Sequence, residues 1–168
     1  RLIIEAVGED PEREGLVETP RRFAEMVAEQ LAYAAVPNEE IARAFDKTFS
    51  SPESDMVVVK DISLFSHCEH HIALMYNMKA AVGYIPRGRV IGLSKIARIA
   101  DAVSKRLQIQ ERIGADIRDV MERITGAGDV IVLLEGEHSC MTARGIRKPG
   151  TLTRTISASG RFRTDEDL

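Results

Sequence analysis

Apolar residues recur at three- and four-residue spacing in four stretches of the chain, and this pattern predicts four helices. The predicted helices cover 20–34, 38–45, a segment that Ser94 caps, and a segment that begins near Gln110. Thr19 is expected to cap the first of these helices. Gly126 is expected to stop the last one, because glycine readily adopts the left-handed conformation that ends a helix.

Runs rich in Val, Ile and Thr predict four strands, at 56–65, 79–85, 130–134 and 151–162. The order along the chain is helices, two strands, two helices and two strands. This order favours an α+β fold, a four-stranded antiparallel sheet with two helices on one face plus N-terminal helices. On the last strand Thr and Ser alternate with larger apolar residues, so we expect a small, polar outer face. That face either pairs with another subunit or is simply solvated, and the strand pattern favours neither.

Length and composition narrow the class of protein further. A chain of 168 residues is expected to form a single domain, 1–168, with a helical N-terminal part at 1–50 and a sheet-containing core at 55–163. The net charge of −3 argues against a nucleic-acid binder, and no apolar run approaches the roughly 20 residues of a membrane helix. No signal peptide opens the chain, and it begins at Arg1 rather than Met, so we expect a natural amino terminus to be missing. Both cysteines have histidines two or three residues away, which fits a reducing compartment, and we expect a cytoplasmic protein.

All four histidines and both cysteines lie in two short clusters, at 67–71 and 138–140. Thiolate and imidazole are the ligands that zinc prefers, so we expect one metal site built from both clusters. A disulfide between Cys68 and Cys140 is the alternative, and it is disfavoured because each cysteine has histidines two or three residues away. Three ligands with a position open to water are typical of a catalytic zinc, whereas a zinc that only ties two strands together is the structural alternative.

The candidate ligands in the two clusters are His67, Cys68, His70, His71, His138 and Cys140. Cys68 and His71 are three residues apart, so the chain must turn between them for both to reach one ion. His138 and Cys140 share a face if their segment stays extended. Histidines that do not bind the metal are natural proton carriers beside it. His67 is expected at the surface or behind a ligand.

Several cations follow these clusters. Lys95 and Arg98 lie near the start of the helix that Ser94 caps, where free N–H groups and the helix dipole favour an anion. Arg144 comes four residues after Cys140, and guanidinium groups suit phosphate oxygens. Solvated surface charge is the alternative for all three cations, and it is least convincing for Arg144. Glu111 opens the next predicted helix, where stabilising the helix dipole is the role that sequence alone favours.

A set of short motifs stands in a specific order along the chain: Cys68-Glu69-His70-His71, Tyr84-Ile85-Pro86, Gly92-Leu93-Ser94-Lys95, Gln108-Ile109-Gln110-Glu111-Arg112 and His138-Ser139-Cys140-Met141. Together they resemble the zinc-dependent GTP cyclohydrolase I family over nearly the whole chain, from about residue 8 to 162. The resemblance implies a T-fold, in which antiparallel sheets with two helices on one face join through their edges into a barrel. It also implies a homo-oligomer, a decamer of two pentamers with active sites at subunit boundaries.

Residue roles also follow from the resemblance, position by position. Cys68, His71 and Cys140 would hold Zn²⁺, and His70 and His138 would transfer protons. Glu111 would anchor the guanine ring with Gln110 beside it as a further substrate-binding residue. Ser94 would belong to the catalytic residues. Together with Lys95, Arg98 and Arg144 it would hold the triphosphate or ribose of the substrate GTP. The implied reaction converts GTP and water to 7,8-dihydroneopterin triphosphate and formate.

Two other functions stay open at this point. One is another pterin-pathway T-fold enzyme, such as a pyruvoyl-tetrahydropterin synthase. The metal site expected of such an enzyme has three histidines, so the Cys–His–Cys set of this chain disfavours that function. The other is a zinc-stabilised oligomeric scaffold that binds a nucleotide without catalysis.

The stretch 72–79 departs from the family pattern. It is one residue longer than usual, and Met78 stands where glycine is common. An extra residue between two strands predicts a bulge or a different hairpin.

Overall fold

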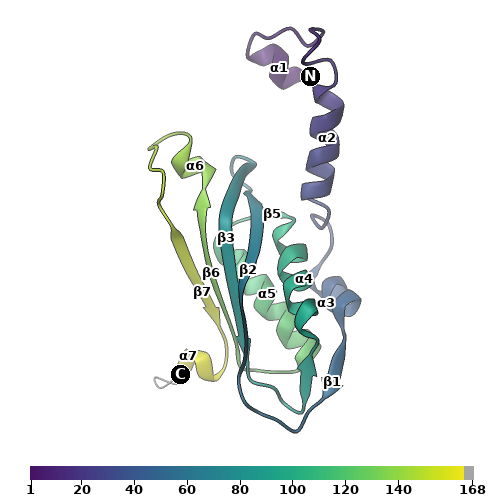
Figure 1. The fold of residues 1–168 in the computed structure, drawn as a ribbon, viewed down its shortest axis with the longest axis vertical. Coiled ribbons are helices and arrows are strands. Elements are labelled where there is room, and N and C mark those ends of the chain that lie inside the picture. Colours follow the sequence, from purple (N-terminus) through teal and green to yellow (C-terminus); the bar gives the residue numbers. More distant parts are fainter. Residues whose placement is uncertain (165–168) are drawn as a thin grey trace. The chain divides into compact units, whose positions relative to one another are not determined.

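The structure is a computed structural model that describes residues 1–164. The chain divides into two compact units, residues 1–32 and the remainder from Tyr33 onward. The first unit contains the helices α1 (Leu2–Ala6) and α2 (Thr19–Gln30) (Figure 1). The prediction that Thr19 caps α2 is wrong, because Thr19 is already helical and Glu18 precedes it as the N-cap. The Glu18 carboxylate makes no capping hydrogen bond and instead pairs with Arg21 at 2.6 Å.

The second unit holds the remaining elements. In chain order these are α3 (Asn38–Phe45), β1 (Thr48–Ser50), β2 (Val57–Cys68), β3 (Ala73–Tyr84), β4 (Arg89–Ile91), α4 (Leu93–Ser104), β5 (Leu107–Gln108), α5 (Gln110–Thr125), β6 (Val130–His138), α6 (Ser139–Thr142), β7 (Thr153–Ala158) and α7 (Arg161–Thr164). The main sheet has the order β5-β2-β3-β6-β7, and β1 pairs with β4 in a small separate sheet. Among the described residues, no helix is both long and apolar enough to cross a lipid bilayer.

The main sheet contains the predicted four antiparallel strands and one that the sequence pattern did not predict. β2, β3, β6 and β7 pair with their neighbours in antiparallel fashion. The additional strand β5 has only two residues and pairs parallel to the end of β2, so the predicted count of four strands is too low. A two-residue strand carries no periodic pattern of its own, since its pairing depends on where the helices before and after it are placed.

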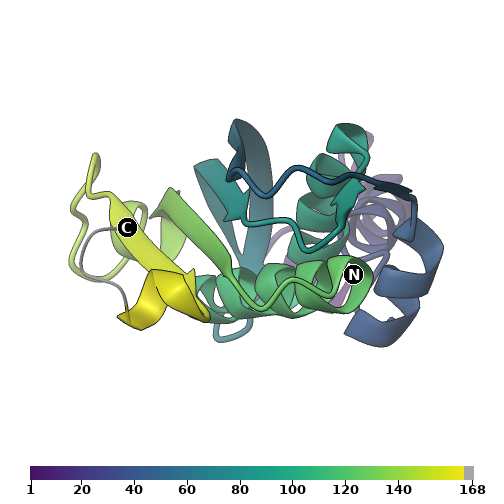
Figure 2. The same ribbon diagram turned by 90° about the horizontal axis from the view of Figure 1, so that it is seen from below.

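Helices α4 and α5 cover one face of the curved sheet, as predicted (Figures 1 and 2). Their apolar stripes are buried against the sheet, including Ile99 on α4 and Ile113 and Ile117 on α5. On the sheet side, every second residue of the central strands is buried under these helices, for example Val82 and Leu134. α5 ends at Gly126, whose φ of 67° is left-handed, as the sequence predicted. α4 begins one residue before Ser94 and has Gly92 as its N-cap, so the prediction of a serine cap is wrong.

The face of strand β7 that packs against α5 is the Thr/Ser face, which the sequence pattern predicted to lie on the outside. Thr155 and Ser157 are half-buried, whereas Ile156 is 63% exposed. The reason is the close approach of α5, where a Cβ added to Gly114 would lie 3.3 Å from the Cβ of Ser157. Larger side chains on this face would push the helix off the strand, so the small polar residues point toward α5 and the apolar ones point away.

The predicted irregularity in 72–79 is a bulge in β3. Met75 pairs with His138, whereas Lys79 pairs with Glu135, so β3 carries one residue more than β6 between these points. Asn77 adopts a left-handed φ of 51° there, and its amide donates a hydrogen bond of 2.9 Å to Glu137. Opposite the bulge, a Cβ on Gly136 would lie 2.6 Å from Met78, so only glycine fits beside that methionine.

Candidate active site

The two clusters of cysteine and histidine lie at the same end of the sheet. β2 and β6 are both antiparallel to β3, which lies between them, so they run in the same direction. β2 ends at Cys68 and β6 ends at His138, and both strands are longer at this end than the sequence pattern predicted. Two segments about seventy residues apart in the sequence therefore end at the same edge of the sheet, one on either side of β3, as the predicted single site requires.

A tight turn brings His71 back to Cys68. The amide of Ile72 donates a hydrogen bond of 2.9 Å to the carbonyl of Cys68, and Ile72 adopts a left-handed φ of 51°. The amide of Glu69 is held by the carbonyl of Gln108 at 3.0 Å. His71 Nδ1 consequently lies 3.9 Å from Cys68 Sγ. This is the turn that the three-residue spacing predicted.

Cys140 reaches the site from the short helix α6 rather than from an extended segment. His138 ends β6, and the backbone turns helical at Ser139, so the extended segment in which His138 and Cys140 would share a face does not form. Two contacts tie α6 to β3: the Ser139 hydroxyl donates to the carbonyl of Leu74, and the Tyr76 hydroxyl lies 3.0 Å from Thr142 Oγ1. These contacts fix the position from which the thiol of Cys140 points inward.

The donor atoms of Cys68, His71 and Cys140 lie within 4.8 Å of one another. Both cysteines are free, so the alternative of a disulfide is not realised. Burial raises the pKa of the Cys140 thiol, and the neighbouring sulfur of Cys68 raises it further, because two thiolates side by side repel each other. A divalent cation removes this repulsion, and two sulfurs with one imidazole nitrogen are a donor set that zinc accepts. The residues present therefore fit a zinc ion.

Arg144 also belongs to this group of side chains. Its guanidinium Nη1 donates a hydrogen bond of 2.6 Å to His71 Nε2. Because the other ring nitrogen of His71 faces the sulfur of Cys68, Arg144 holds the imidazole from its outer side. The chain thus places one cation directly beside the candidate metal ligands, as the sequence spacing of four residues suggested.

The start of α5 reaches the site because β5 pairs with β2. Gln108 lies opposite Cys68 in this parallel pairing, and α5 begins two residues later. An ion pair strengthens the junction. The two terminal nitrogens of the Arg112 guanidinium, Nη1 and Nη2, donate hydrogen bonds of 2.6 and 3.2 Å to the Glu69 carboxylate. This bond to Arg112 holds the pKa of Glu69 below its usual value. No local sequence pattern indicates this pair, because its members are 43 residues apart.

A cavity of about 280 Å³ opens at this junction. Its lining residues are Cys68, His70, Met75, Ile109, Gln110, Glu111, His138 and Cys140. The structure therefore brings the two cysteines together with both predicted proton carriers and both predicted base-contacting residues. We call this space the Cys–His cavity.

His138 is the most constrained imidazole of the Cys–His cavity. Its Nε2 lies 2.8 Å from the side-chain oxygen of Gln110, and the glutamine is 1% exposed. Burial lowers the pKa of His138, and the nearby carboxylate of Glu111 partly opposes this. His70, in contrast, is exposed in the turn, where its ring lies edge-on to that of His71.

Three predicted substrate residues lie away from the Cys–His cavity of their own chain. Ser94, Lys95 and Arg98 are in the first two turns of α4. The other end of α4 is the one near the cavity, because Ser66 donates a hydrogen bond of 2.7 Å to the carbonyl of Ser104. Twelve helical residues span roughly 18 Å, which separates the start of α4 from the cysteines by most of the length of the helix.

His67 is neither at the surface nor part of the metal cluster. Its side chain is buried, and within residues 1–164 its Nδ1 has no hydrogen-bond partner. Burial lowers its pKa, because an apolar surrounding disfavours the charged ring. Of the two positions that the sequence left open for His67, the surface is wrong, and the position behind a ligand stays a prediction.

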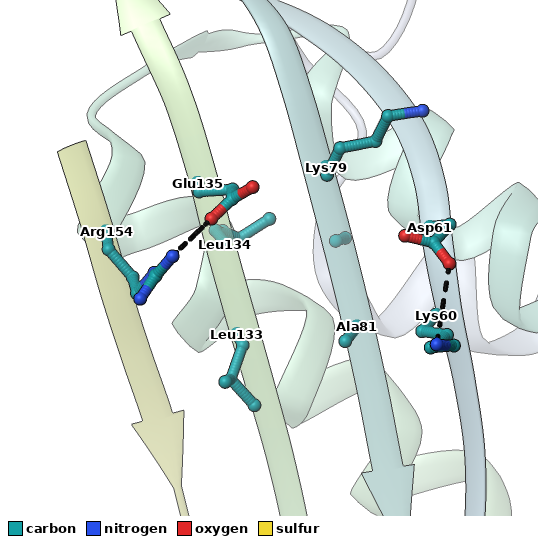
Figure 3. Close-up of a pocket in the computed structure, with 9 residues that line it drawn as sticks. Lys60, Asp61, Lys79, Ala81, Leu133, Leu134, Glu135 and Arg154 are labelled. Atoms are coloured by element: carbon teal, nitrogen blue, oxygen red, sulfur yellow. Dashed lines mark hydrogen bonds and ion pairs between the residues drawn. The ribbon is translucent and has the colours of Figure 1, made fainter. Parts of the chain in front are cut away.

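A second cavity, of about 260 Å³, lies on the face of the sheet that the helices leave uncovered (Figure 3). We call it the sheet-face cavity. Its charged side chains are Lys60 and Asp61 on β2, Lys79 on β3, Glu135 on β6 and Arg154 on β7. Arg154 binds Glu135 at 2.8 Å, and Lys79 donates to the hydroxyl of Ser63 at 2.6 Å. Cysteine and histidine do not occur among its lining residues.

Known proteins resemble this chain at the level of fold and of sequence. A solved structure described as the archaeosine synthase QueF-Like in the apo form superimposes with a TM-score of 0.50 over 66% of this chain and 96% of that chain, at 18% identity. This likeness shows that the two chains share a mixed α+β fold. The family model of GTP cyclohydrolase I matches residues 1–168. The chain belongs to that family.

Two curated relatives show how near the sequence lies to other members. GTP cyclohydrolase 1 of Clostridium acetobutylicum is 56% identical over 173 residues, covering 100% of this chain and 89% of the relative. GTP cyclohydrolase 1 of Clostridium botulinum (strain Kyoto / Type A2) is 57% identical, covering 98% of this chain and 87% of the relative.

Proposed function

We propose that this chain is a GTP cyclohydrolase I, which converts GTP and water to 7,8-dihydroneopterin triphosphate and formate. The observation that carries the proposal is the meeting of Cys68, His71 and Cys140 with two further histidines and Glu111 around one cavity. Membership of the family and relatives with more than half of their residues identical support the same reaction.

Cys68, His71 and Cys140 would hold the metal ion, which we propose to be zinc. Bound there, zinc would make a hydroxide available at neutral pH to attack an electrophilic carbon. Ligation through His71 Nδ1 leaves the ring proton on Nε2, and a guanidinium cannot accept a hydrogen bond. Arg144 must then turn away from His71, and its charge becomes available for a phosphate.

The remaining side chains of the cavity would bind the purine and move protons. Glu111 would accept two N–H bonds from the edge of the guanine ring, which adenine cannot offer in the same arrangement. His138 or His70 would protonate a ring nitrogen, so that the bond from that nitrogen to C8 can break. A second hydrolysis then releases C8 as formate. The ribose part rearranges through an enol before the new ring closes, and this stage needs a proton carrier near the sugar.

We propose that a neighbouring copy of the chain completes the site. Ser94, Lys95 and Arg98 lie at the far end of α4 from the cysteines of their own chain, so one chain alone does not join them to the Cys–His cavity. A homo-oligomer, in the family's form a decamer of two pentamers, would bring them from the adjacent subunit to the ribose and triphosphate. Free thiols at the metal site fit a reducing compartment such as the cytoplasm.

The proposal is tested by incubating the purified protein with GTP, oxidising the product with iodine, and measuring pterin fluorescence and released formate. We expect both products from GTP and neither from ATP, since the guanine edge is what Glu111 reads. Prior removal of the metal with a chelator should abolish both products, and added zinc should restore them. Protein that retains one zinc per chain and forms no pterin would instead support the non-catalytic scaffold.

A further inference from the structure

The side-chain amide of Gln110 is held in one orientation. Its nitrogen Nε2 lies 3.0 Å from the carbonyl oxygen of Thr153, 3.3 Å from that of Leu134, and 3.3 Å from the hydroxyl oxygen of Thr155. Carbonyl oxygens only accept hydrogen bonds, so the NH₂ group, not the oxygen, must face them. These contacts fix which end of the amide points toward β6 and β7 and which end points toward His138.

The other end of the amide determines where His138 carries its proton. Gln110 Oε1 lies 2.8 Å from His138 Nε2. An amide oxygen only accepts, so His138 Nε2 must be the donor and carries the hydrogen. In the neutral ring the lone pair is then on Nδ1. The orientation of one buried amide therefore selects the tautomer of the imidazole.

We infer that Gln110 is a positioning residue that holds His138 in its Nε2–H tautomer, so that the proton exchanged with the substrate moves at Nδ1. The inference rests on the proposed function, because it assigns how one of its proton carriers is prepared. During the exchange Nδ1 accepts a proton from the substrate or returns it, while the Nε2–H bond to Gln110 stays intact. This role differs from the one that the sequence resemblance implies, which places Gln110 beside the guanine ring.

Burial argues against direct contact of the Gln110 side chain with the base. The residue borders the Cys–His cavity, but only 1% of its surface is exposed. Its donors face three acceptors and its oxygen faces His138. Glu111, the next residue, is exposed and also lines the Cys–His cavity, so its carboxylate can make the contact with guanine that Gln110 cannot.

The central variant is Gln110→Met, which keeps the length of the side chain and removes both hydrogen-bonding ends. We expect kcat to fall by about 10- to 100-fold, the range found when a group that orients an active-site histidine is lost, with KM changed by less than about twofold. In the background of His138→Ala the same substitution should lower the rate by less than about twofold, since the histidine that it positions is already gone.

Gln108→Met is the matched control. Gln108 is also 1% exposed, and its amide is also engaged, at 2.9 Å from Asp116 and 3.3 Å from the carbonyl of Val103. This variant reports the general cost of placing a methionine where a buried glutamine stood. We expect a comparable loss of stability, a kcat within about threefold of wild type, and unchanged zinc content in both variants. If Gln110→Met fails to fold, Thr155→Val removes one of the three contacts and should give a smaller loss in kcat of the same kind.

A spectroscopic measurement tests the inference without using activity. Protein labelled with ¹⁵N-histidine has only four imidazoles, so magic-angle-spinning NMR can assign each ring with the help of His138→Ala. We expect Nε2 of His138 to be protonated in the wild type, and Gln110→Met to shift it toward the other tautomer.

Two results would overturn the inference: an Nδ1–H tautomer of His138 in the wild type, or a Gln110→Met variant in which KM rises while kcat is kept. Failure of the proposed function looks different, because the wild type would then form no pterin from GTP while the tautomer measurement still reports on Gln110.

Discussion

The Cys–His cavity and the sheet-face cavity have similar volumes, about 280 and about 260 Å³, but they are built in different ways. The sheet-face cavity is lined by residues of four adjacent strands, and one of its ion pairs, Glu135 with Arg154, joins two of these strands. Glu135 and Arg154 are opposite each other in the register of β6 and β7, and their ion pair is largely exposed. The Cys–His cavity instead collects side chains from the ends of β2 and β6, from α6 and from the start of α5.

This difference separates a surface hollow from a site with chemistry. Exposed ion pairs between neighbouring strands follow from the strand register and contribute little free energy. At the Cys–His cavity the thiols of Cys68 and Cys140 lie close to each other and to the imidazole of His71, and a second imidazole, that of His138, is held by a buried amide. Keeping polar groups together and partly out of water costs free energy, so such a cluster points to function.

The sharpest test of the comparison is to remove a candidate metal ligand. We expect Cys140→Ala to lower pterin formation by about 10³-fold or more and to reduce bound zinc well below one ion per chain. The matched control is Lys79→Ala in the sheet-face cavity, which should keep zinc and activity within about twofold of wild type. Zinc by elemental analysis and pterin fluorescence measure both outcomes. Equal effects of the two substitutions would erase the distinction between the cavities.

A smaller loss is expected when the carboxylate of Glu111, which we propose to bind the guanine edge, is neutralised. Glu111→Gln replaces an acceptor by a group that presents a donor to the guanine N–H groups. Because a hydrogen bond to a charged group is worth about 1.5–3 kcal/mol, kcat/KM for GTP should fall by about 10- to 100-fold. Glu122→Gln, farther along α5 where Glu122 lies 3.6 Å from Arg118, is the control and should leave kcat/KM unchanged. A Glu111→Gln enzyme with normal kcat/KM would remove Glu111 from the site.

Two carboxylate–guanidinium pairs allow the cavities to be compared directly. Glu69→Gln loosens the bond between the turn that bears His71 and the start of α5, so we expect kcat/KM to fall by about three- to tenfold at unchanged zinc content. Glu135→Gln breaks the corresponding pair with Arg154 in the sheet-face cavity, and we expect less than a twofold change. If both substitutions have the same effect, the pair of Glu69 with Arg112 has no special role.

The smallest effect is expected in the acid dependence of stability. The hydrogen bond from Arg112 lowers the pKa of Glu69 in the folded state. The stability that this pair contributes is therefore complete above the ordinary pKa of glutamate, about 4.3, and is lost as the pH falls through the lowered value. Wild type and Glu69→Gln should differ in urea midpoint at about pH 7 and become equal at about pH 2 to 3. A difference that grows on acidification would contradict the assigned direction.

Much of the fold follows from the residue pattern. α3 spans 38–45 and α5 begins at Gln110, as predicted, because both have clear helical spacing and α5 has a glycine stop. The strand ends were less predictable: β2 continues to Cys68 although its last residues are not strand formers, because pairing with β3 and β5 holds them. The face of β7 could not be predicted, since alternation shows which residues share a face and not which face a helix will cover.

In the candidate site, too, the residue types could be predicted from the sequence, whereas contacts between distant residues could not. The identity of the cysteines and histidines made a metal site predictable, because few other uses gather these residue types. The contacts of Gln110 and Arg112 depend on partners 24 or 43 residues away in the sequence, Leu134 and Thr153 for the first and Glu69 for the second. No local spacing contains that information.

The bulge at Asn77 has a consequence for how this protein tolerates changes in chain length. β3 has one residue more than each of its neighbours at this point, since Leu64 pairs with Met78 and Ser66 with Met75 on the other side of the strand. Beyond the bulge the pairing resumes, and Met75 lies opposite His138. An extra residue in this hairpin is thus absorbed within the strand, and it leaves Met75 in register with both Ser66 and His138.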